Sequence, residues 1–509
     1  RKPIMSTTSD NNKRIAKNTM MLYIRMAITM LVQLYTSRIV LEVLGVSDFG
    51  LWNLVASVIV SISFITGPLT IATQRFISFN LGKEDKAGVA SVFSQSMLLY
   101  IAFGLLIILI LETVGLWFLN HKLQIPPNRI EIANIIFQLS IISLIFTILR
   151  MPYDATIIAH EKMDFYAYMS IADVLMKLGI VFLLLIIDSL PHLIVYSLLM
   201  LTVNILIMLI YKIYCNKKYP DTTKIKFKIE SDTLKSMASF SGWSLLGAFS
   251  VMTANQGVNM VLNIFFGVVI NATMGITNQV SNAVNQFISN FQTAFNPQIV
   301  KSYAANDESR FTFLILSCCR ISFNLMILIS VPLIFNMEAI LRAWLGQVPE
   351  YLPIFCQLTL LYMIIDAISA SINMGIYASG KIKTYQLIIS FSILMILPFS
   401  YLVLKLGCYA PFVILVRLII SIISLIIRII IINNRVTISI IPQFIKLFPR
   451  LLLVCCIAAL IPYVLTLITD FNWIIITIID LAWSLGTVYL IGINNAERDL
   501  IKKIIFKRK

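Results

Sequence analysis

Apolar stretches of roughly 20 residues recur along the whole chain, and each is long enough to cross a bilayer core about 30 Å thick. Such stretches fold as helices, because backbone polar groups in lipid must be satisfied within the segment. Hydrophobic residues make up 59% of the 509 residues, charged residues 13%, and the mean hydropathy is +0.89. This composition is outside the range of soluble domains, so we predict an all-α polytopic membrane protein.

The spacing of the stretches predicts about fourteen transmembrane helices. They lie near residues 18–43, 49–79, 89–119, 131–158, 166–187, 192–214, 238–265, 271–299, 311–344, 352–379, 385–404, 409–432, 444–468 and 473–492. The predicted parts are a cytoplasmic N-terminal segment at 1–17, an N-lobe at 18–214, a basic cytoplasmic linker at 215–237, a C-lobe at 238–432, two further helices within 433–492 and a basic cytoplasmic tail at 493–509.

Basic residues concentrate on alternate connections between the predicted spans. The N-terminal segment, the linker and the tail are rich in Lys and Arg, whereas the opposite loops hold only Lys122, Arg129, Arg342 and Lys405. The positive-inside rule therefore places both termini in the cytoplasm. The formal net charge of +16 is mainly a topology signal. We expect no nucleic-acid partner, because no soluble module combines a basic patch with aromatic residues.

Two pairs of segments indicate an internal repeat. Residues 45–85 align with 267–307 at a shift of 222, and "AHEKMDFYAY" from 159 aligns with "ASGKIKTYQ" from 378 at a shift of 219. The second pair places Tyr166 on Tyr385. Similar shifts in different helices predict two pseudo-symmetric six-helix lobes of the same orientation, with two C-terminal helices outside the repeat. Chance similarity between apolar helices is the alternative.

The segment "VLGVSDFGLWNLVASVIVSISFITGPLTIATQRFISFNLGK", with Gly45, Gly50, Gly67 and Arg75, resembles the Wzx-type polysaccharide repeat-unit flippases of the MATE-like MOP exporter superfamily. The loop "ASGKIKTYQ" is similar to that family's loop before the eleventh helix. The resemblance covers most of the chain. It implies a V-shaped pair of lobes that moves an undecaprenyl-diphosphate-linked oligosaccharide across the inner membrane by alternating access, with a polysaccharide polymerase and glycosyltransferases as candidate partners.

The segment "NATMGITNQVSNAVNQFISNFQTAFN" at 271–296 contains six Asn, three Gln and no charged residue. At helical spacing its amides form one polar face, and the preceding span carries a second, shorter stripe. Amides facing lipid would lack partners, so both stripes should face a water-filled cavity or another helix. Interhelical bonding is the alternative to a glycan path. The residues expected to line that path are Asn255, Asn259, Asn278, Asn282, Asn285 and Gln292.

Four membrane arginines, Arg25, Arg75, Arg320 and Arg417, lack an acidic partner on the same helix face, and the first three lie roughly 9 to 14 Å from the cytoplasmic ends of their helices. A guanidinium matches phosphate oxygens while staying charged. We therefore predict that Arg25, Arg75 and Arg320 hold the lipid diphosphate. Snorkelling to lipid headgroups is the alternative. Other basic residues have an acidic partner four positions away and should form structural ion pairs, namely Arg38 with Glu42, Arg150 with Asp154, and Lys177 with Asp173.

Asp366 lies near the middle of the tenth predicted span. It is a candidate for coupling transport to Na+ or H+, and neutralising Arg320 or Arg417 is the alternative. A cation-coupled multidrug exporter of the MATE type is the alternative function, although the first span carries arginine rather than a carboxylate. The outer loops are short, and no P-loop, HExxH or supported GxSxG motif occurs. We therefore expect a transporter among membrane lipids rather than an enzyme, without cofactor or metal site.

Overall fold

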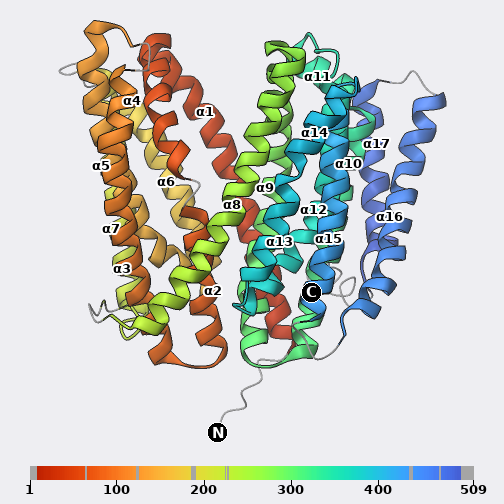
Figure 1. Cartoon of the computed structure of the whole chain (residues 1–509), viewed down its shortest axis with the longest axis horizontal. Coiled ribbons are helices and arrows are strands. Elements are labelled where there is room, and N and C mark those ends of the chain that lie inside the picture. Colours follow the sequence, from red (N-terminus) through yellow and green to blue (C-terminus); the bar gives the residue numbers. More distant parts are fainter. Residues whose placement is uncertain are drawn as a thin grey trace, which may run out of the picture. The chain divides into compact units, whose positions relative to one another are not determined.

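The computed structural model describes residues 8–63, 66–121, 125–184, 191–223, 225, 229–434, 439–468 and 472–494. Within these ranges the chain forms helices and no strand (Figure 1). The predicted all-α class is therefore confirmed. Eleven helices in the described ranges are long and apolar enough to cross a membrane.

The count of fourteen spans stays a prediction. Helices α8 (Ser231–Phe266) and α9 (Val268–Ala304) are 36 and 37 residues long, which is enough to cross a bilayer. They are not among the eleven apolar spans. The many amide side chains of α8 and α9 lower the hydropathy of these two helices. Both helices nevertheless cover predicted spans, at 238–265 and 271–299.

The chain divides into two compact units, residues 1–248 and 249–509, and the division falls inside α8. The first unit contains the start of α8 preceded by α1 (Thr8–Ser63), α2 (Thr66–Gly82), α3 (Lys86–Ile110), a π-helical turn η1 (Leu111–Gly115), α4 (Leu116–His121), a 3-10 turn η2 (Pro127–Arg129), α5 (Ile130–Ala159), α6 (Met163–Leu184) and α7 (His192–Lys218).

The second unit contains the rest of α8 and the helices that follow it. These are α9, α10 (Glu308–Phe335), α11 (Met337–Leu345), α12 (Leu352–Ala378), α13 (Lys383–Leu394), α14 (Ile396–Lys405), α15 (Phe412–Asn433), α16 (Ile441–Ile468), α17 (Trp473–Thr487) and a π-helical turn η3 (Val488–Gly492).

The first unit has an apolar interior and an apolar outer surface. Helix α5 packs on α7 and α1 packs on α6, and the edge of the Phe93 ring meets Tyr153 with 5.2 Å between centroids. On α3, Leu105 and Leu109 are 63% and 61% exposed and lie one turn apart. Such an exposed apolar stripe suits contact with lipid chains rather than water.

Helix α12 is the central helix of the second unit, where it packs against α9, α10 and α15. Gly375 allows this close packing. A Cβ atom at that position would lie 2.6 Å from both Ile315 Cδ1 on α10 and Ile432 Cδ1 on α15. Because α12 is enclosed in this way, the polar residues on its remaining face are held in fixed positions.

Unusual backbone conformations repeat along the chain at the same shifts, 222 and 219 residues, at which the sequence segments align. Gly45 has φ 73° and ψ 167°, and Gly267, 222 residues later, has φ 74° and ψ −162°. Gly45 interrupts α1 between the first two predicted spans, and Gly267 separates α8 from α9. Left-handed corners recur at the same shifts, with Glu84 (φ 58°) matching Asn306 (φ 55°) and Glu161 (φ 59°) matching Gly380 (φ 75°).

Helix starts also repeat at the first shift. The Asp85 side chain caps α3 by accepting from the Gly88 backbone N–H at 2.8 Å. The Asp307 side chain caps α10 by accepting from the Arg310 N–H at 3.0 Å. Both caps satisfy a backbone donor that the first turn of a helix leaves unpaired.

Candidate functional site

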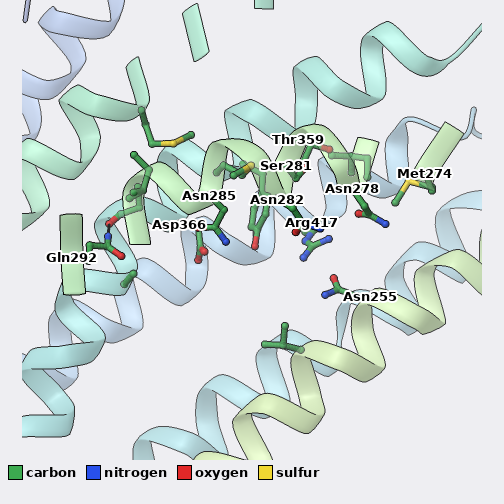
Figure 2. A pocket seen from close by; sticks show the side chains of 18 residues that line it. Asn255, Met274, Asn278, Ser281, Asn282, Asn285, Gln292, Thr359, Asp366 and Arg417 are labelled. Atoms are coloured by element: carbon green, nitrogen blue, oxygen red, sulfur yellow. Dashed lines mark hydrogen bonds between the residues drawn. The ribbon is translucent and has the colours of Figure 1, made fainter. Parts of the chain in front are cut away.

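The amide face of α9 forms one wall of a cavity in the second unit. Asn278, Asn282 and Asn285 follow one another at steps of four and three, and all three are exposed. Their side chains make no hydrogen bond to any described residue. The predicted polar face is therefore present, and these three amides lie open to the cavity (Figure 2).

The cavity has a volume of about 250 Å³ and lies entirely within residues 249–509. Helices α8, α9, α10, α12 and α15 contribute to its wall. Amides, hydroxyls and two opposite charges gather on this wall, which sets it apart from the apolar helix surfaces around it. Its polar lining consists of Asn255, Asn278, Ser281, Asn282, Asn285, Gln292, Thr359, Tyr362, Asp366 and Arg417.

The shorter amide stripe on α8 divides between two environments. Asn255 lines the cavity and lies across it from the α9 amides (Figure 2). Asn259, one turn later, is not part of the lining. Its Oδ1 is buried and accepts no hydrogen bond within the described ranges. Only the first of these two α8 residues is therefore placed where a ligand in this cavity would meet it.

Gln292 joins three helices at one end of the lining. Its Nε2 donates to Ser322 Oγ on α10 at 3.2 Å and to the Ala367 carbonyl on α12 at 3.0 Å. Figure 2 shows it at the opposite end of the labelled row from Met274. Interhelical bonding is therefore the observed role of Gln292, whereas the amides of Asn278, Asn282 and Asn285 make no such bonds within the described chain.

Two charged side chains face the same cavity. Arg417 on α15 places its guanidinium carbon 4.6 Å from the ring centroid of Tyr362 on α12. Asp366 lies one turn after Tyr362 and close to Asn285 and Asn282 on the cavity wall (Figure 2). Its carboxylate makes no ion pair with Arg320 or Arg417, and no hydrogen bond to any described group. Asp366 is therefore accessible to a ligand or an ion.

The three arginines predicted to hold a diphosphate lie outside this cavity. Arg25 on α1 lies over the Tyr166 ring at 4.9 Å, and Arg75 on α2, which is 5% exposed, lies over Phe76 at 4.6 Å. Both belong to the first unit, whereas Arg320, which is 7% exposed, belongs to α10 in the second. Their joint contact with one diphosphate stays a prediction.

Two of the three predicted ion pairs are confirmed. Arg150 Nε lies 3.1 Å from Asp154 Oδ2, and Lys177 Nζ lies 2.8 Å from Asp173 Oδ2. The third, between Arg38 and Glu42, lies outside the described side chains.

Two arginines of α15, Arg417 and Arg428, occupy positions in the structure that were not predicted from the sequence. Arg417 lacks an acidic partner on its own helix face, and the residues predicted for the diphosphate do not include it. Arg428 is 6% exposed, and its Nε donates to the Tyr385 hydroxyl at 3.2 Å, which in turn donates to Asn373 Oδ1. Their separation of eleven residues, three turns on one face, was the signal available in the sequence.

Comparison with solved structures assigns a fold. A mutant MATE protein superposes with a TM-score of 0.73 at 13% identity over 83% of this chain and 96% of that one. An outward-facing multidrug resistance MATE family transporter of the MOP superfamily gives 0.66 at 17% over 84% and 96%. A MOP superfamily transporter from Pyrococcus furiosus gives 0.67 at 16% over 84% and 96%.

The chain therefore has the fold of MATE transporters of the MOP superfamily. No protein-family model and no curated protein matches its sequence. At identities this low, the similarity establishes only that the helices are arranged in the same way. The function therefore has to be argued from the cavity.

Proposed function

We propose that the protein is a flippase that moves an undecaprenyl-diphosphate-linked oligosaccharide across a bacterial inner membrane by alternating access. The amide face of the cavity is the observation that carries this proposal. Asn278, Asn282 and Asn285 each offer donors and acceptors without a partner in the described chain. Sugar hydroxyls also donate and accept, so they match amides better than they match purely cationic or apolar walls.

The charge of the lining also supports an acidic or phosphate-bearing substrate. Arg417 brings a permanent cation to the wall, and a guanidinium binds phosphate or carboxylate oxygens through a planar fork of donors. For the Pyrococcus furiosus transporter, reverse polarity of the binding pocket suggests a different function. The polarity of the pocket is therefore a property that can distinguish functions among proteins with this fold. Arg25, Arg75 and Arg320 remain the residues that we propose for the diphosphate itself.

Asp366 favours a second candidate, a cation-coupled multidrug exporter of the MATE type. Its carboxylate faces the cavity without an ion pair to a described residue, as a site that binds Na+, H+ or a cationic drug requires. In the flippase, the same carboxylate would couple transport to Na+ or H+. The two candidates differ in what Arg417 does, because a permanent cation beside the carboxylate repels a cationic drug.

The proposed setting follows from the flippase. Both termini would be cytoplasmic, so that the substrate enters from the side on which glycosyltransferases build it. A polysaccharide polymerase on the outer side would receive the flipped unit. The protein itself would bind and move the lipid-linked sugar without making or breaking a covalent bond.

Deletion of the gene in its host tests the proposal. We expect undecaprenyl-diphosphate-linked oligosaccharide to accumulate on the cytoplasmic leaflet while surface glycan is lost, and the wild-type gene to restore both. Unchanged lipid-linked sugar together with new sensitivity to cationic drugs would instead establish the exporter. Sugar transfer by the purified protein without added enzymes would overturn both transport functions.

A further inference from the structure

A buried carboxyl group lies in α17, away from the cavity. Asp480 is 0% exposed, and its Oδ2 accepts a hydrogen bond from Asn336 Nδ2, just after α10, at 2.8 Å. Asn336 Nδ2 also donates to the Pro332 carbonyl at 3.0 Å, so both hydrogens of this amide are used. The other carboxyl oxygen, Asp480 Oδ1, is buried and has no hydrogen-bond partner in the described chain.

Asp480 begins a row of buried polar groups along the contact between α10 and α17. Ser484 and Thr487 lie one and two turns further on the same face of α17. Both hydroxyls are buried, and neither has a hydrogen-bond partner among the residues that the structure describes. The opposite face of α17 is apolar and outward, as 61% exposure of Ile478 shows. The polar row is therefore shielded by protein on one side and by an apolar surface on the other.

Two contacts set the register between these helices. Asn336 meets Asp480, and a Cβ atom at Gly492 would lie 2.8 Å from the Asn324 amide. The two helices run in opposite directions, so the stretch from Asn324 to Asn336, at the end of α10, lies beside the stretch from Asp480 to Gly492.

No charged group within the described residues balances Asp480. The elements that pack on α17 are α10, α16 and η3. On α10 the nearest charged residue to Asn336 is Arg320, about 24 Å earlier along the helix. On α11, which begins directly after Asn336, the exposed Glu338 and Arg342 pair with each other at 2.6 Å. On α16, Arg450 donates to Ile491 and Ile493 carbonyls and to Asn494, beyond the far end of α17. The other charged or titratable groups on these elements are Glu308, Arg310, Cys318, Cys319, Lys446, Cys455, Cys456, Tyr463 and Tyr489, and none of them forms an ion pair or hydrogen bond with Asp480.

An ionised carboxylate in a membrane interior is very costly unless a cation or several donors surround it, and otherwise the group takes up a proton. Asp480 has a single neutral donor, Asn336. We infer that Asp480 is a proton-binding site, in which a proton from water binds Oδ1 and converts the carboxylate to a neutral acid. The Oδ1–H then becomes a donor, and a hydroxyl such as that of Ser484, one turn away, is a suitable acceptor.

This site is separate from the cavity and does not depend on what the protein transports. Loss of the proton would leave a negative charge between α10 and α17, and that charge would favour water entry and weaken the helix contact. Proton binding at Asp480 therefore links the acidity of the surroundings to the attachment of α17.

Infrared spectroscopy of the purified full chain in lipid at pH 7 tests the site directly. We expect a protonated-carboxyl stretching band in the wild type and its loss in Asp480→Asn, which keeps shape and an acceptor for Asn336. The matched control is Glu338→Gln, because Glu338 is exposed and pairs with Arg342 at 2.6 Å, and we expect the band to be unchanged. Should Asp480→Asn fail to fold, Asp480→Glu retains the acid and should shift the band instead of removing it.

Two results would overturn the inference. The first is a band that Asp480→Asn leaves intact, or no such band in the wild type. The second is disappearance of the band when NaCl replaces choline chloride at constant pH, because this would identify sodium as the ion bound at Asp480.

Discussion

The guanidinium carbon of Arg417 lies 4.6 Å from the ring centroid of Tyr362. Tyr362 lies on α12, one helical turn before Asp366. A cation–π contact of this kind contributes about 0.5–2 kcal/mol and restrains the position of the guanidinium. The contact therefore joins α15 to α12 at the cavity wall and holds a cation near a carboxylate without a direct ion pair between them.

Arg417→Gln should lower flipping about tenfold or more, because hydrogen bonds from a charged donor contribute about 1.5–3 kcal/mol. Arg417→Lys should be intermediate, since it keeps the charge and loses the planar fork. Accumulation of lipid-linked oligosaccharide in cells measures the effect. Arg342→Gln, which removes an exposed cation paired with Glu338, is the control and should leave flipping unchanged. Normal flipping by Arg417→Gln would remove this residue from the substrate path.

Single cysteines on α9 should separate the cavity face from the packed face. In a background without native cysteines, Asn285→Cys should react with an aqueous thiol reagent, because Asn285 is exposed and lines the cavity. Val284→Cys, at a position 5% exposed, should be protected. Equal reactivity at the two neighbours, or no reaction at Asn278, Asn282 and Asn285 in any state, would contradict a water-filled path.

Gln292→Leu should destabilise the second unit by about 1 kcal/mol, because it removes two interhelical hydrogen bonds of about 0.6 kcal/mol each. Asn285→Leu removes the same kind of side chain where the described chain offers no partner, so it should leave stability nearly unchanged and impair transport. Thermal unfolding in detergent, followed together with flipping, measures both. A larger loss of stability in Asn285→Leu would show that its amide is structural.

Gly267→Ala should cost about 1–3 kcal/mol, because φ 74° with ψ −162° is a conformation that residues with a side chain rarely adopt. Gly275→Ala, also on α9 and with open space around an added Cβ, should be neutral or stabilising. Gly45→Ala should match Gly267→Ala, since φ there is 73°. Unfolding temperatures of the three variants provide the comparison, and a harmless Gly267→Ala would argue against a strained corner.

Asp366→Asn should remove any dependence of transport on a Na+ or H+ gradient while substrate binding is retained. The reason is that the carboxylate is the accessible acidic group of the cavity, with no ion pair in the described chain. Transport into proteoliposomes with and without each gradient is the measurement. Gradient dependence that survives in Asp366→Asn would assign coupling elsewhere.

The helical class, the breaks near Gly45 and Gly267 and the amide face could all be predicted from sequence, for a shared physical reason. Apolar runs in lipid have one regular solution, and unpartnered amides must avoid lipid wherever they occur. Asn278, Asn282 and Asn285 therefore revealed their face through spacing alone.

The choice of Arg417 over Arg320 as the cavity arginine could not be predicted in this way. Helix α15 has one polar face, with Arg417, Ser421, Ser424 and Arg428 at helical spacing, but this spacing alone does not say whether the face meets the cavity or another helix, and α10 is packed on most sides. Which arginine meets the cavity depends on packing around α12, including the close approach at Gly375. Asp480 was missed because its partner, Asn336, is 144 residues away in sequence.

The left-handed corners of the two units recur at the shifts of the predicted repeat, although most of the residues that form them differ. Of the three matched pairs in the described residues, one has glycine at both members, Gly45 and Gly267, whereas Glu84 is matched by Asn306 and Glu161 by Gly380. Glu and Asn occupy corners with φ of 55° to 59°, whereas Gly45 and Gly267 combine positive φ with extended ψ, a conformation that is essentially confined to glycine. The two halves of this chain can therefore be aligned by the positions of their left-handed corners as well as by their residues.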